Sequence, residues 1–306
     1  MKTLIIPDIH ERIIQAQSII NFEQHDHVIF TGDFFDSYDL PTNSSQKTAE
    51  WVKDKLYNDR YTVLTGNHDV SYMFCENSFQ RQISYCSGFN EHRKYTINSI
   101  LSREDWNKFK IATECNGVFL SHAGLSNGLF NFLKSIDNSF LKSNVDNIKG
   151  LVNELNTEWS KASDDMIKCV NGWHPFLWVG FYRGGRNPHG GLTWCDAREY
   201  SPLDSVVSVF GHTRNASNRN VFLSLRSRKK VDGRSYLYSP PIDTRDYSKM
   251  LLNGVGVGID ADLRSYATIE DDILTVYSVI YNNELQVESS KPVFKLNTKT
   301  LIEIKL

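Results

Sequence analysis

The 306-residue sequence has few cysteines, little net charge and no long apolar run. Its five cysteines are odd in number and lack Cys-x-x-Cys spacing, which argues against a disulfide framework or a cysteine zinc site. The net charge of −2 gives no global electrostatic reason to bind nucleic acid or a membrane. The N-terminal apolar run ends at Pro7-Asp8, too early for a signal peptide, and no membrane-spanning length of about 18 apolar residues follows. We therefore expect a cytoplasmic protein without a membrane partner.

Short apolar runs bounded by turn residues predict buried strands. They lie at residues 3–6, 27–31, 61–65, 117–121, 205–210 and 254–259. Helical spacing predicts helices at 11–22, with Ile13, Ile14, Ser18 and Ile19 near one face, and at 43–57, opened by an Asn/Ser cap. Alternating strands and helices indicate a layered α/β fold whose ligands bind at the carboxyl ends of strands.

The second half of the chain is less regular. Residues 126–200 predict a helical and irregular insert or cap, helical to about 166, with candidate buried positions Leu129, Leu133, Ile136, Leu151, Leu155 and Trp159. Residues 171–198 have loop composition, and a loop of this length is typically functional or disordered. Residues 266–306 alternate apolar and polar positions around Asn282-Asn283, which indicates a hairpin, and we expect C-terminal strands within residues 261–306. We expect one domain spanning residues 1–306.

Five polar clusters stand at or just past predicted strand ends. They are Asp8-Ile9-His10, Gly32-Asp33-Phe34-Phe35-Asp36, Gly66-Asn67-His68-Asp69, His122-Ala123-Gly124 and Gly211-His212-Thr213. Carboxylate, imidazole and amide ligands together suit divalent ions such as Mn²⁺, Fe²⁺ or Zn²⁺. Two such ions roughly 3.5–4 Å apart can share a carboxylate and a hydroxide while they hold phosphate oxygens. The clusters therefore predict hydrolysis of a phosphate ester by a metal-bound hydroxide, with two divalent ions as cofactors.

With these motifs the sequence resembles the calcineurin-like metallophosphoesterases. Their motifs are DxH, GDxxD, GNH(D/E), a histidine before a small residue and a terminal GH, and the resemblance spans roughly residues 3–260. It implies a β-sandwich of two mixed sheets flanked by helices. It also implies roles: one metal on Asp8, His10 and the bridging Asp33, the second metal on Asn67, His122 and His212, His68 as general acid, and Asp36 holding the His68 imidazole.

The terminal motif points to one branch of that superfamily. Many of its nucleases and phosphodiesterases carry GHxH, whereas Gly211-His212-Thr213-Arg214 lacks the second histidine. This is similar to the phosphoprotein-phosphatase branch, which includes symmetrical diadenosine tetraphosphate hydrolases. Residues 192–196 (LTWCD) and 258–260 (GID) resemble further segments of that branch. Two positions depart from it: Ser37 stands where the branch has a phosphate-binding arginine, and Asp69 where it has glutamate.

Four arginines are candidates to replace the missing phosphate contact. Arg183 and Arg186 flank Gly184-Gly185 and are the better candidates, while Arg12 and Arg214 follow ligand histidines. An exposed, solvated arginine is the alternative interpretation of each. The aromatic residues of the same segment would stack a nucleobase or anchor the loop to the core: Trp173, Phe176, Trp178, Phe181 and Tyr182.

These observations favour a phosphomonoesterase that acts on a phosphoprotein or a small phosphate ester. The alternative is a nucleotide hydrolase that acts on a dinucleoside polyphosphate or a cyclic or oligonucleotide phosphodiester, so that nucleic acid is expected only as a substrate. A catalytically inactive metal-binding scaffold is the third hypothesis, and the complete set of motif residues argues against it. Mn²⁺ is the first expectation for the metal, with Fe, Zn, Ni and Mg as alternatives.

Overall fold

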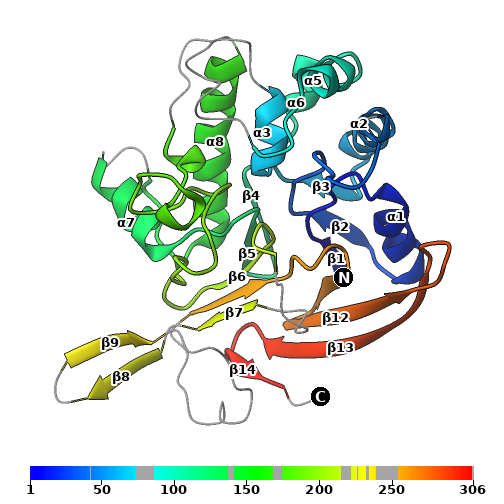
Figure 1. The fold of residues 1–306 in the computed structure, drawn as a ribbon. Helices are drawn as coiled ribbons and strands as arrows, with labels where there is room; N and C mark the ends of the chain where they lie inside the picture. Colours follow the sequence, from blue (N-terminus) through cyan, green and yellow to red (C-terminus); the bar gives the residue numbers. More distant parts are fainter. Residues whose placement is uncertain are drawn as a thin grey trace.

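The computed structural model describes residues 1–41, 43–73, 86–136, 141–167, 174–214, 222–225, 227–231, 234–238 and 254–304. Two mixed β-sheets and their flanking helices make up the fold (Figure 1). This confirms the layered α/β fold that the sequence predicts and the sandwich of two mixed sheets that the family resemblance implies.

The larger sheet has seven strands in the order β14-β13-β12-β11-β1-β2-β3. The strands β1, β2 and β3 run parallel to one another, and the remaining pairs are antiparallel. Their bounds are β1 Lys2–Ile6, β2 His27–Phe30, β3 Tyr61–Val63, β11 Ser265–Glu270, β12 Ile273–Tyr281, β13 Val287–Asn297 and β14 Ile302–Glu303.

The smaller sheet has five strands in the order β4-β5-β6-β10-β7, and its central strands β5, β6 and β10 are parallel. Their bounds are β4 Ala112–Cys115, β5 Val118–Ser121, β6 Val207–Phe210, β7 Phe222–Leu225 and β10 Val255–Gly258. A separate antiparallel hairpin of β8 (Ser227–Val231) and β9 (Arg234–Tyr238) projects from this end of the molecule (Figure 1).

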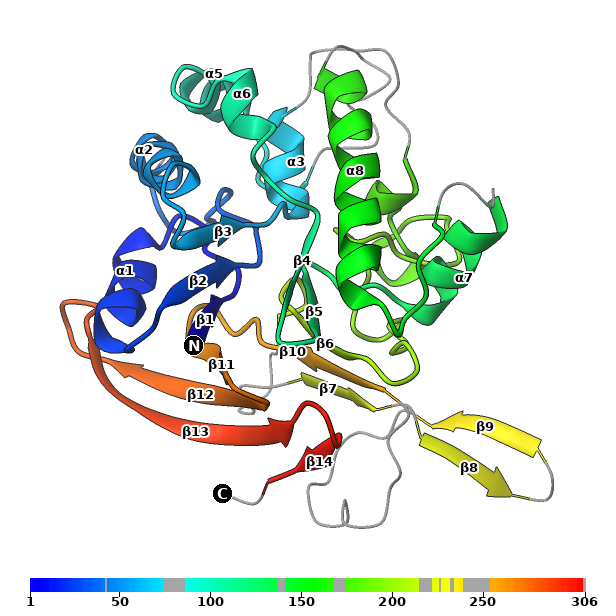
Figure 2. The ribbon, with the colours of Figure 1, turned by 180° about the vertical axis from the view of Figure 1, so that it is seen from behind.

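The helices flank the two sheets. Figures 1 and 2 show α1 and α2 beside β1–β3, and α8 beside β4 and β5. The bounds are α1 Ile13–Phe22, α2 Ser44–Leu56, α3 Asn67–Met73, α5 Glu91–Asn98, α6 Arg103–Trp106, α7 Asn127–Ile136 and α8 Ile148–Ile167, with 3₁₀ turns at Pro175–Leu177 and Phe181–Arg183. Among the described residues, no helix has the length and apolarity to cross a membrane.

Strand alternation builds two hydrophobic cores. In β1, Ile5 belongs to the core between the sheets, while Leu4 and Ile6 belong to the core under the helices. The strand is therefore buried on both faces, as expected of a parallel strand in a layered fold. Each such aliphatic side chain contributes about 1.5–3 kcal/mol on burial. Parallel β1, β2 and β3 also end at one edge of the sheet, which brings the polar residues that follow them together.

Most predicted elements are present with slightly shifted ends. The runs predicted as strands correspond to β1, β2, β3, β5, β6 and β10, and the predicted hairpin corresponds to β12 and β13. Residues 127–136 and 148–167 are helical, and residues 174–198 form only short 3₁₀ turns. The strand β11 lies within the predicted C-terminal strands, whereas the edge strand β4 and the strands β7, β8 and β9 are not predicted from the sequence.

Two predicted core positions are wrong. Ile14 is 53% exposed, because α1 turns Ala16, Ile19 and Ile20 toward the sheet instead. Ile136, at the last turn of α7, is 48% exposed. The expected cap of α2 is also absent, since the Asn43 side chain accepts no hydrogen bond from the helix.

Candidate metal centre

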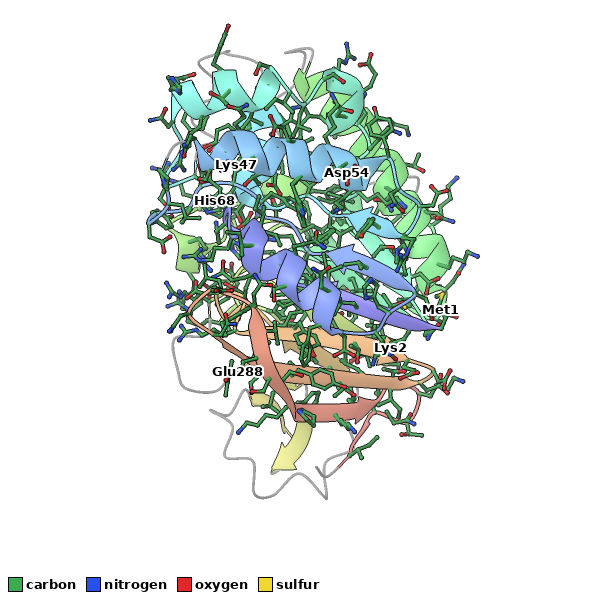
Figure 3. All side chains as sticks on the ribbon, turned by 90° about the vertical axis from the view of Figure 1, so that its right-hand side faces the viewer. Met1, Lys2, Lys47, Asp54, His68 and Glu288 are labelled. Carbon is green, nitrogen blue, oxygen red and sulfur yellow. The ribbon has the colours of Figure 1, made fainter. Side chains whose placement is uncertain are left out.

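The polar residues that follow five strands gather at one edge of the sandwich. The loops after β1, β2, β5 and β6 and the first turn of α3 supply Asp8, His10, Asp33, Asp36, Asn67, His68, His122 and His212. All are buried except His10, which is partly exposed. In Figure 3, His68 lies on the opposite side of the molecule from Met1 and Lys2, which places the site away from the start of β1.

Several of these residues have left-handed backbone conformations. The φ angles are +43° at His10, +54° at Asp33, +66° at Asp36 and +63° at His212. Such conformations cost of order 1–3 kcal/mol for a residue with a side chain and persist only where the surroundings enforce them. They mark the loops after β1, β2 and β6 as segments whose geometry is set by the site.

Two glycines permit the close approach of the loops. A β-carbon on Gly66 would lie 2.1 Å from Asp33 Oδ1, and one on Gly211 would lie 1.9 Å from Asp8 Oδ1. Both distances are far inside van der Waals contact, so these positions require glycine. The glycines of the GN and GH motifs therefore belong to the site, because they leave space for the carboxylates beside them.

The first group of candidate ligands consists of His10, Asp33 and His68, whose ligand atoms lie within 4.8 Å of one another. His10 Nε2 is 3.9 Å from Asp33 Oδ2. His10 Nδ1 is 2.9 Å from the carbonyl of Phe35, an acceptor that fixes the proton on Nδ1. The lone pair of Nε2 therefore faces Asp33, as metal binding requires.

The second group consists of Asp33, His122 and His212, again within 4.8 Å. His122 Nε2 lies 3.4 Å from Asp33 Oδ2, 2.9 Å from Asn67 Oδ1 and 3.1 Å from His212 Nδ1. His122 Nδ1 donates to the carbonyl of Thr31, so that the neutral imidazole presents an unprotonated Nε2. Asp33 is shared by both groups, and Asn67 adds an oxygen to the second.

The donor set fits a pair of cations. His122 Nε2 in that tautomer, Asn67 Oδ1 and Asp33 Oδ2 are all electron-pair donors brought within hydrogen-bonding range of one another. His212 Nε2 is buried without a hydrogen-bond partner among the described residues. Two divalent ions that share Asp33 would satisfy these atoms, and two His/Asp groups are the arrangement of a dinuclear centre.

The electrostatics of the site also favour positive charge. Burial lowers the pKa of the His122 imidazole, but Asp33 and Asp8 outweigh it and raise the pKa to about 9. Burial would raise the pKa of Asp33, yet the imidazoles of His122, His68 and His10 hold it well below its usual range. In the protein alone, protonated imidazole compensates the buried carboxylates, a role that metal ions would take.

Asp8 lies beside the two groups. Its carboxylate accepts hydrogen bonds from the backbone N–H of His212 at 3.1 and 3.0 Å, and its Oδ1 is 3.9 Å from His122 Nδ1. Burial and the neighbouring carboxylate of Asp260 raise the pKa of Asp8. Asp260 is the acidic residue of the predicted GID segment, and burial raises its pKa to about 6. These contacts tie the first predicted ligand to the loop of the last one.

Asp36 and His68 form a buried pair. His68 Nδ1 lies 2.8 Å from Asp36 Oδ2, and the hydroxyl of Tyr72 donates to Asp36 Oδ1. Burial would lower the pKa of His68, but Asp33 and Asp36 raise it. The His68 and His10 rings meet edge to face with centroids 5.0 Å apart. The imidazole for which the family resemblance implies a general-acid role is therefore oriented by a carboxylate and lies beside the candidate metal ligands.

Two residues, Asp69 and Cys86, hold the site in place, and the sequence predicts this role for neither of them. Asp69 accepts the backbone N–H groups of Asp33, Phe34 and Gly66, each at 2.8 Å, and thereby joins two site loops. Its position in the GNHD motif is where the phosphoprotein-phosphatase branch has glutamate, a side chain that also carries a carboxylate. Cys86 Sγ accepts from Asn67 Nδ2 at 3.0 Å.

This contact of Cys86 turns the amide oxygen of Asn67 toward His122 and His212. No sequence signal marked Cys86, because its partner is distant in the chain.

The four candidate arginines have different surroundings. Arg183 Nη2 donates to the carbonyl of His212 at 3.1 Å and to the Thr213 hydroxyl, while its Nε pairs with Asp196 at 2.9 Å. Arg186 is exposed. Arg12 pairs with Asp39 and Arg214 with Asp262. Contact with a candidate ligand is thus seen for Arg183, and substrate binding by any of the four stays a prediction.

The aromatic residues of this segment divide into two sets. Phe176 and Trp178 are buried and anchor the loop to the core, whereas Phe181 and Tyr182 are 60% and 55% exposed. Trp173 lies outside the described residues. Anchoring therefore explains part of the aromatic content, and two rings beside Arg183 are left at the surface.

Comparison with known proteins agrees with this site. Residues 1–214 match the family model of calcineurin-like phosphoesterases. A search among curated proteins found no significant match. The solved structures that are similar include a cold-active protein tyrosine phosphatase, at 12% identity and a TM-score of 0.53, covering 98% of this chain and 80% of that chain.

Two other similar structures have TM-scores of 0.38. A metallophosphoesterase from Sphaerobacter thermophilus is 14% identical, covering 92% of this chain and 90% of that chain. A protein serine/threonine phosphatase from Saccharomyces cerevisiae is 11% identical, covering 95% of this chain and 79% of that chain. Likenesses at such identities concern the fold and carry no information on substrate.

The matched motifs, the sandwich and the two His/Asp groups define a metal-dependent phosphoric ester hydrolase. The chain belongs to the calcineurin-like phosphoesterase family, whose profile covers more than two thirds of its length.

Proposed function

We propose that this protein is a phosphomonoesterase of the phosphoprotein-phosphatase branch of its family. The observation that carries the proposal is the end of the terminal motif. Position 214, where a GHxH enzyme has its second histidine, is Arg214, and its guanidinium pairs with Asp262. An arginine supplies no electron pair to a metal ion. The protein therefore lacks the feature typical of the phosphodiesterase branch.

We assign the metal ligands as two sets. Asp8, His10 and Asp33 would hold one cation, and Asn67, His122 and His212 would hold the second, with Asp33 common to both groups of candidate ligands. When bound, two divalent cations would make a water nucleophile available near neutral pH and would offset charge on the phosphate oxygens. Backbone carbonyls fix the imidazole tautomers of two of these ligands, His10 and His122.

His68 is the proposed general acid. Its Nδ1 is held by Asp36, so Nε2 is the nitrogen that carries a proton to the leaving oxygen. The carboxylates of Asp33 and Asp36 favour the protonated imidazole before the reaction. Protonation of the departing oxygen by a positioned group contributes typically 10²–10⁴-fold to the rate.

Arg183 is the proposed phosphate contact. Its Nη2 bonds to the backbone carbonyl of His212, which places the guanidinium at the edge of the metal centre. Asp196 fixes the other side through Nε. Among the described residues no partner is found for Nη1, which can therefore donate to a phosphate oxygen. A fixed cation at this position compensates for the absence of an arginine after Asp36, and it favours the doubly charged phosphate of a monoester.

A nucleotide substrate is the second candidate. The observation in its favour is that Phe181 and Tyr182, directly before Arg183, are exposed, and Arg198 lies 4.7 Å over the Tyr182 ring. Exposed aromatic rings beside a phosphate contact would stack a base. The same rings would equally suit an aromatic leaving group.

The test is a comparison of p-nitrophenyl phosphate with bis-p-nitrophenyl phosphate on Mn²⁺-loaded protein. Faster turnover of the monoester is the expected result, and a preference for the diester would refute the assignment to this branch. A panel of phosphopeptides, mononucleotides and dinucleoside polyphosphates then separates the two candidate substrate classes. Arg183→Ala should raise KM for the monoester, and Arg60→Ala, at an exposed position, is the matched control.

A further inference from the structure

A buried guanidinium lies behind the Asp36–His68 pair. Arg93, in the first turn of α5, is 7% exposed. Its Nη1 is 3.6 Å from Asp36 Oδ1 and 3.5 Å from Glu11 Oε1, and its Nη2 donates to the carbonyl of Ser37 at 3.2 Å. Asp36 and Glu11 are themselves buried, at 0% and 3% exposure. The guanidinium thus contacts two buried carboxylates and one backbone carbonyl of the segment that connects Asp36 to α2.

The segment that leads into α5 packs directly on the Asp36 turn. A β-carbon on Gly88 would lie 3.2 Å from the β-carbon of Asp36, and Gly88 has φ +98°. The side chain of Asn90 then accepts from the backbone N–H of Arg93 and begins the helix. The start of α5, and with it Arg93, is therefore held in place against Asp36.

The Glu11 contact extends this arrangement to the first metal loop. Glu11 follows the candidate ligand His10, and its backbone N–H donates to the carbonyl of Phe34. Its carboxylate accepts from the hydroxyls of Ser44 and Ser45 at the start of α2. Through Glu11 and Asp36, Arg93 joins the loop after β1 to the loop after β2.

Arg93 is not placed to bind substrate. Its guanidinium is buried and directed at three protein acceptors, in contrast to the partly exposed Arg183. A buried carboxylate without a nearby cation is costly, and removal of one partner of a buried ion pair typically costs 3–5 kcal/mol. Asp36 already accepts from His68 and Tyr72, and Arg93 adds a buried positive charge 3.6 Å from its Oδ1.

We infer that Arg93 is a positioning residue that holds Asp36, and through it His68, in the orientation needed to protonate the leaving oxygen. The inference rests on the proposed function, because it assigns Arg93 to the same acid step. It predicts a defect that depends on the leaving group. An acidic leaving group departs without help, whereas a basic one requires the proton from His68.

The experiment compares p-nitrophenyl phosphate, whose leaving group is acidic, with phenyl phosphate, whose leaving group is more basic. The variants are Arg93→Gln, which keeps a polar side chain, Arg93→Lys, which keeps the charge, and Arg60→Gln, a control at an exposed position. Arg93→Gln should lower kcat on phenyl phosphate by roughly 10–100-fold, the scale of a misplaced catalytic group, and should lower kcat on p-nitrophenyl phosphate several-fold less. Arg93→Lys should recover part of the loss.

A double variant isolates the route through His68. In a His68→Ala background, Arg93→Gln should change kcat little, because the group it positions is absent. Equal losses on both substrates, or a full additional loss in the His68→Ala background, would overturn the inference. If thermal melting shows that Arg93→Gln does not fold, Arg93→Lys is measured instead. A ratio of kcat on phenyl phosphate to kcat on p-nitrophenyl phosphate equal to that of the wild type then overturns the inference. Failure of the wild-type protein to hydrolyse either monoester refutes the proposed function itself, which keeps the two failures distinct.

Discussion

Replacement of Asp69 should lower the free energy of unfolding by an amount that follows from the hydrogen bonds of its carboxylate. Its carboxylate accepts three backbone N–H groups, with Oδ2 receiving those of Asp33 and Gly66 and Oδ1 that of Phe34. Asp69 is fully buried, so Asp69→Ala leaves three buried donors without a partner. An unsatisfied buried donor costs about 1–3 kcal/mol, which gives a total loss of at least about 3 kcal/mol. In Asp69→Asn the amide oxygen can take the place of Oδ2 and accept the N–H groups of Asp33 and Gly66. The amide nitrogen then takes the place of Oδ1 and is itself a donor, so the Phe34 N–H loses its acceptor. The expected loss of unfolding free energy is about 1–3 kcal/mol.

The measurement is the free energy of unfolding from urea denaturation of the metal-free variants. The expected order is wild type, then Asp69→Asn, then Asp69→Ala, and Asp54→Ala at a 79% exposed side chain is the control. Asp69→Asn should also weaken metal binding, because the backbone of Asp33, which belongs to both groups of candidate ligands, loses its fixed position. A free energy of unfolding for Asp69→Ala within about 1 kcal/mol of wild type would refute the reasoning.

Three further predictions concern single side chains. His68→Ala should lower turnover roughly 10²–10⁴-fold while metal analysis finds the ions retained, and normal turnover would contradict the acid role. Cys86→Ala should weaken Mn²⁺ binding, measured by calorimetry, about 10–100-fold, because Asn67 loses the contact that orients its amide; Cys86→Ser, which keeps an acceptor, should be milder. Burial lowers the pKa of His174 to about 4 in the folded protein, whereas its pKa in the unfolded chain is near 6.5. The folded protein therefore favours the neutral imidazole, and the full contribution of this residue to stability is present above about pH 6.5. Stability should fall by up to roughly 3 kcal/mol as pH decreases from 6.5 to 4, and His174→Asn should show a shallower decline in urea denaturation across that range.

The sequence allowed the residues at strand ends to be predicted because their position follows from general rules. A run such as residues 27–31 identifies a buried strand, and parallel strands end at one edge, so that Asp33 and its counterparts in neighbouring loops had to meet. The proximity of Asp36 to His68 came from the family resemblance, and the structure shows them hydrogen-bonded. The glycines beside the ligands follow the same logic, since two loops that meet so closely exclude a β-carbon.

The residues that support the ligands could not be predicted in this way. Arg93 and Cys86 come from a segment without strand alternation, and they meet their partners over 56 and 19 positions of sequence. Ile14 is exposed for a related reason. Helical spacing locates the buried face of α1 only to within about one residue, and packing against the sheet decides which residues at its border are buried. Tertiary contacts set these features, and a single sequence does not record them.

The most direct test of a dinuclear centre is titration of metal-free protein with Mn²⁺, followed by calorimetry and metal analysis. We predict two equivalents bound per chain, and weaker binding of both in Asp33→Asn, because Asp33 belongs to both His/Asp groups. Binding of no ion, of a single ion, or of two full equivalents at unchanged affinity in Asp33→Asn would contradict the shared-carboxylate centre on which the proposed chemistry depends.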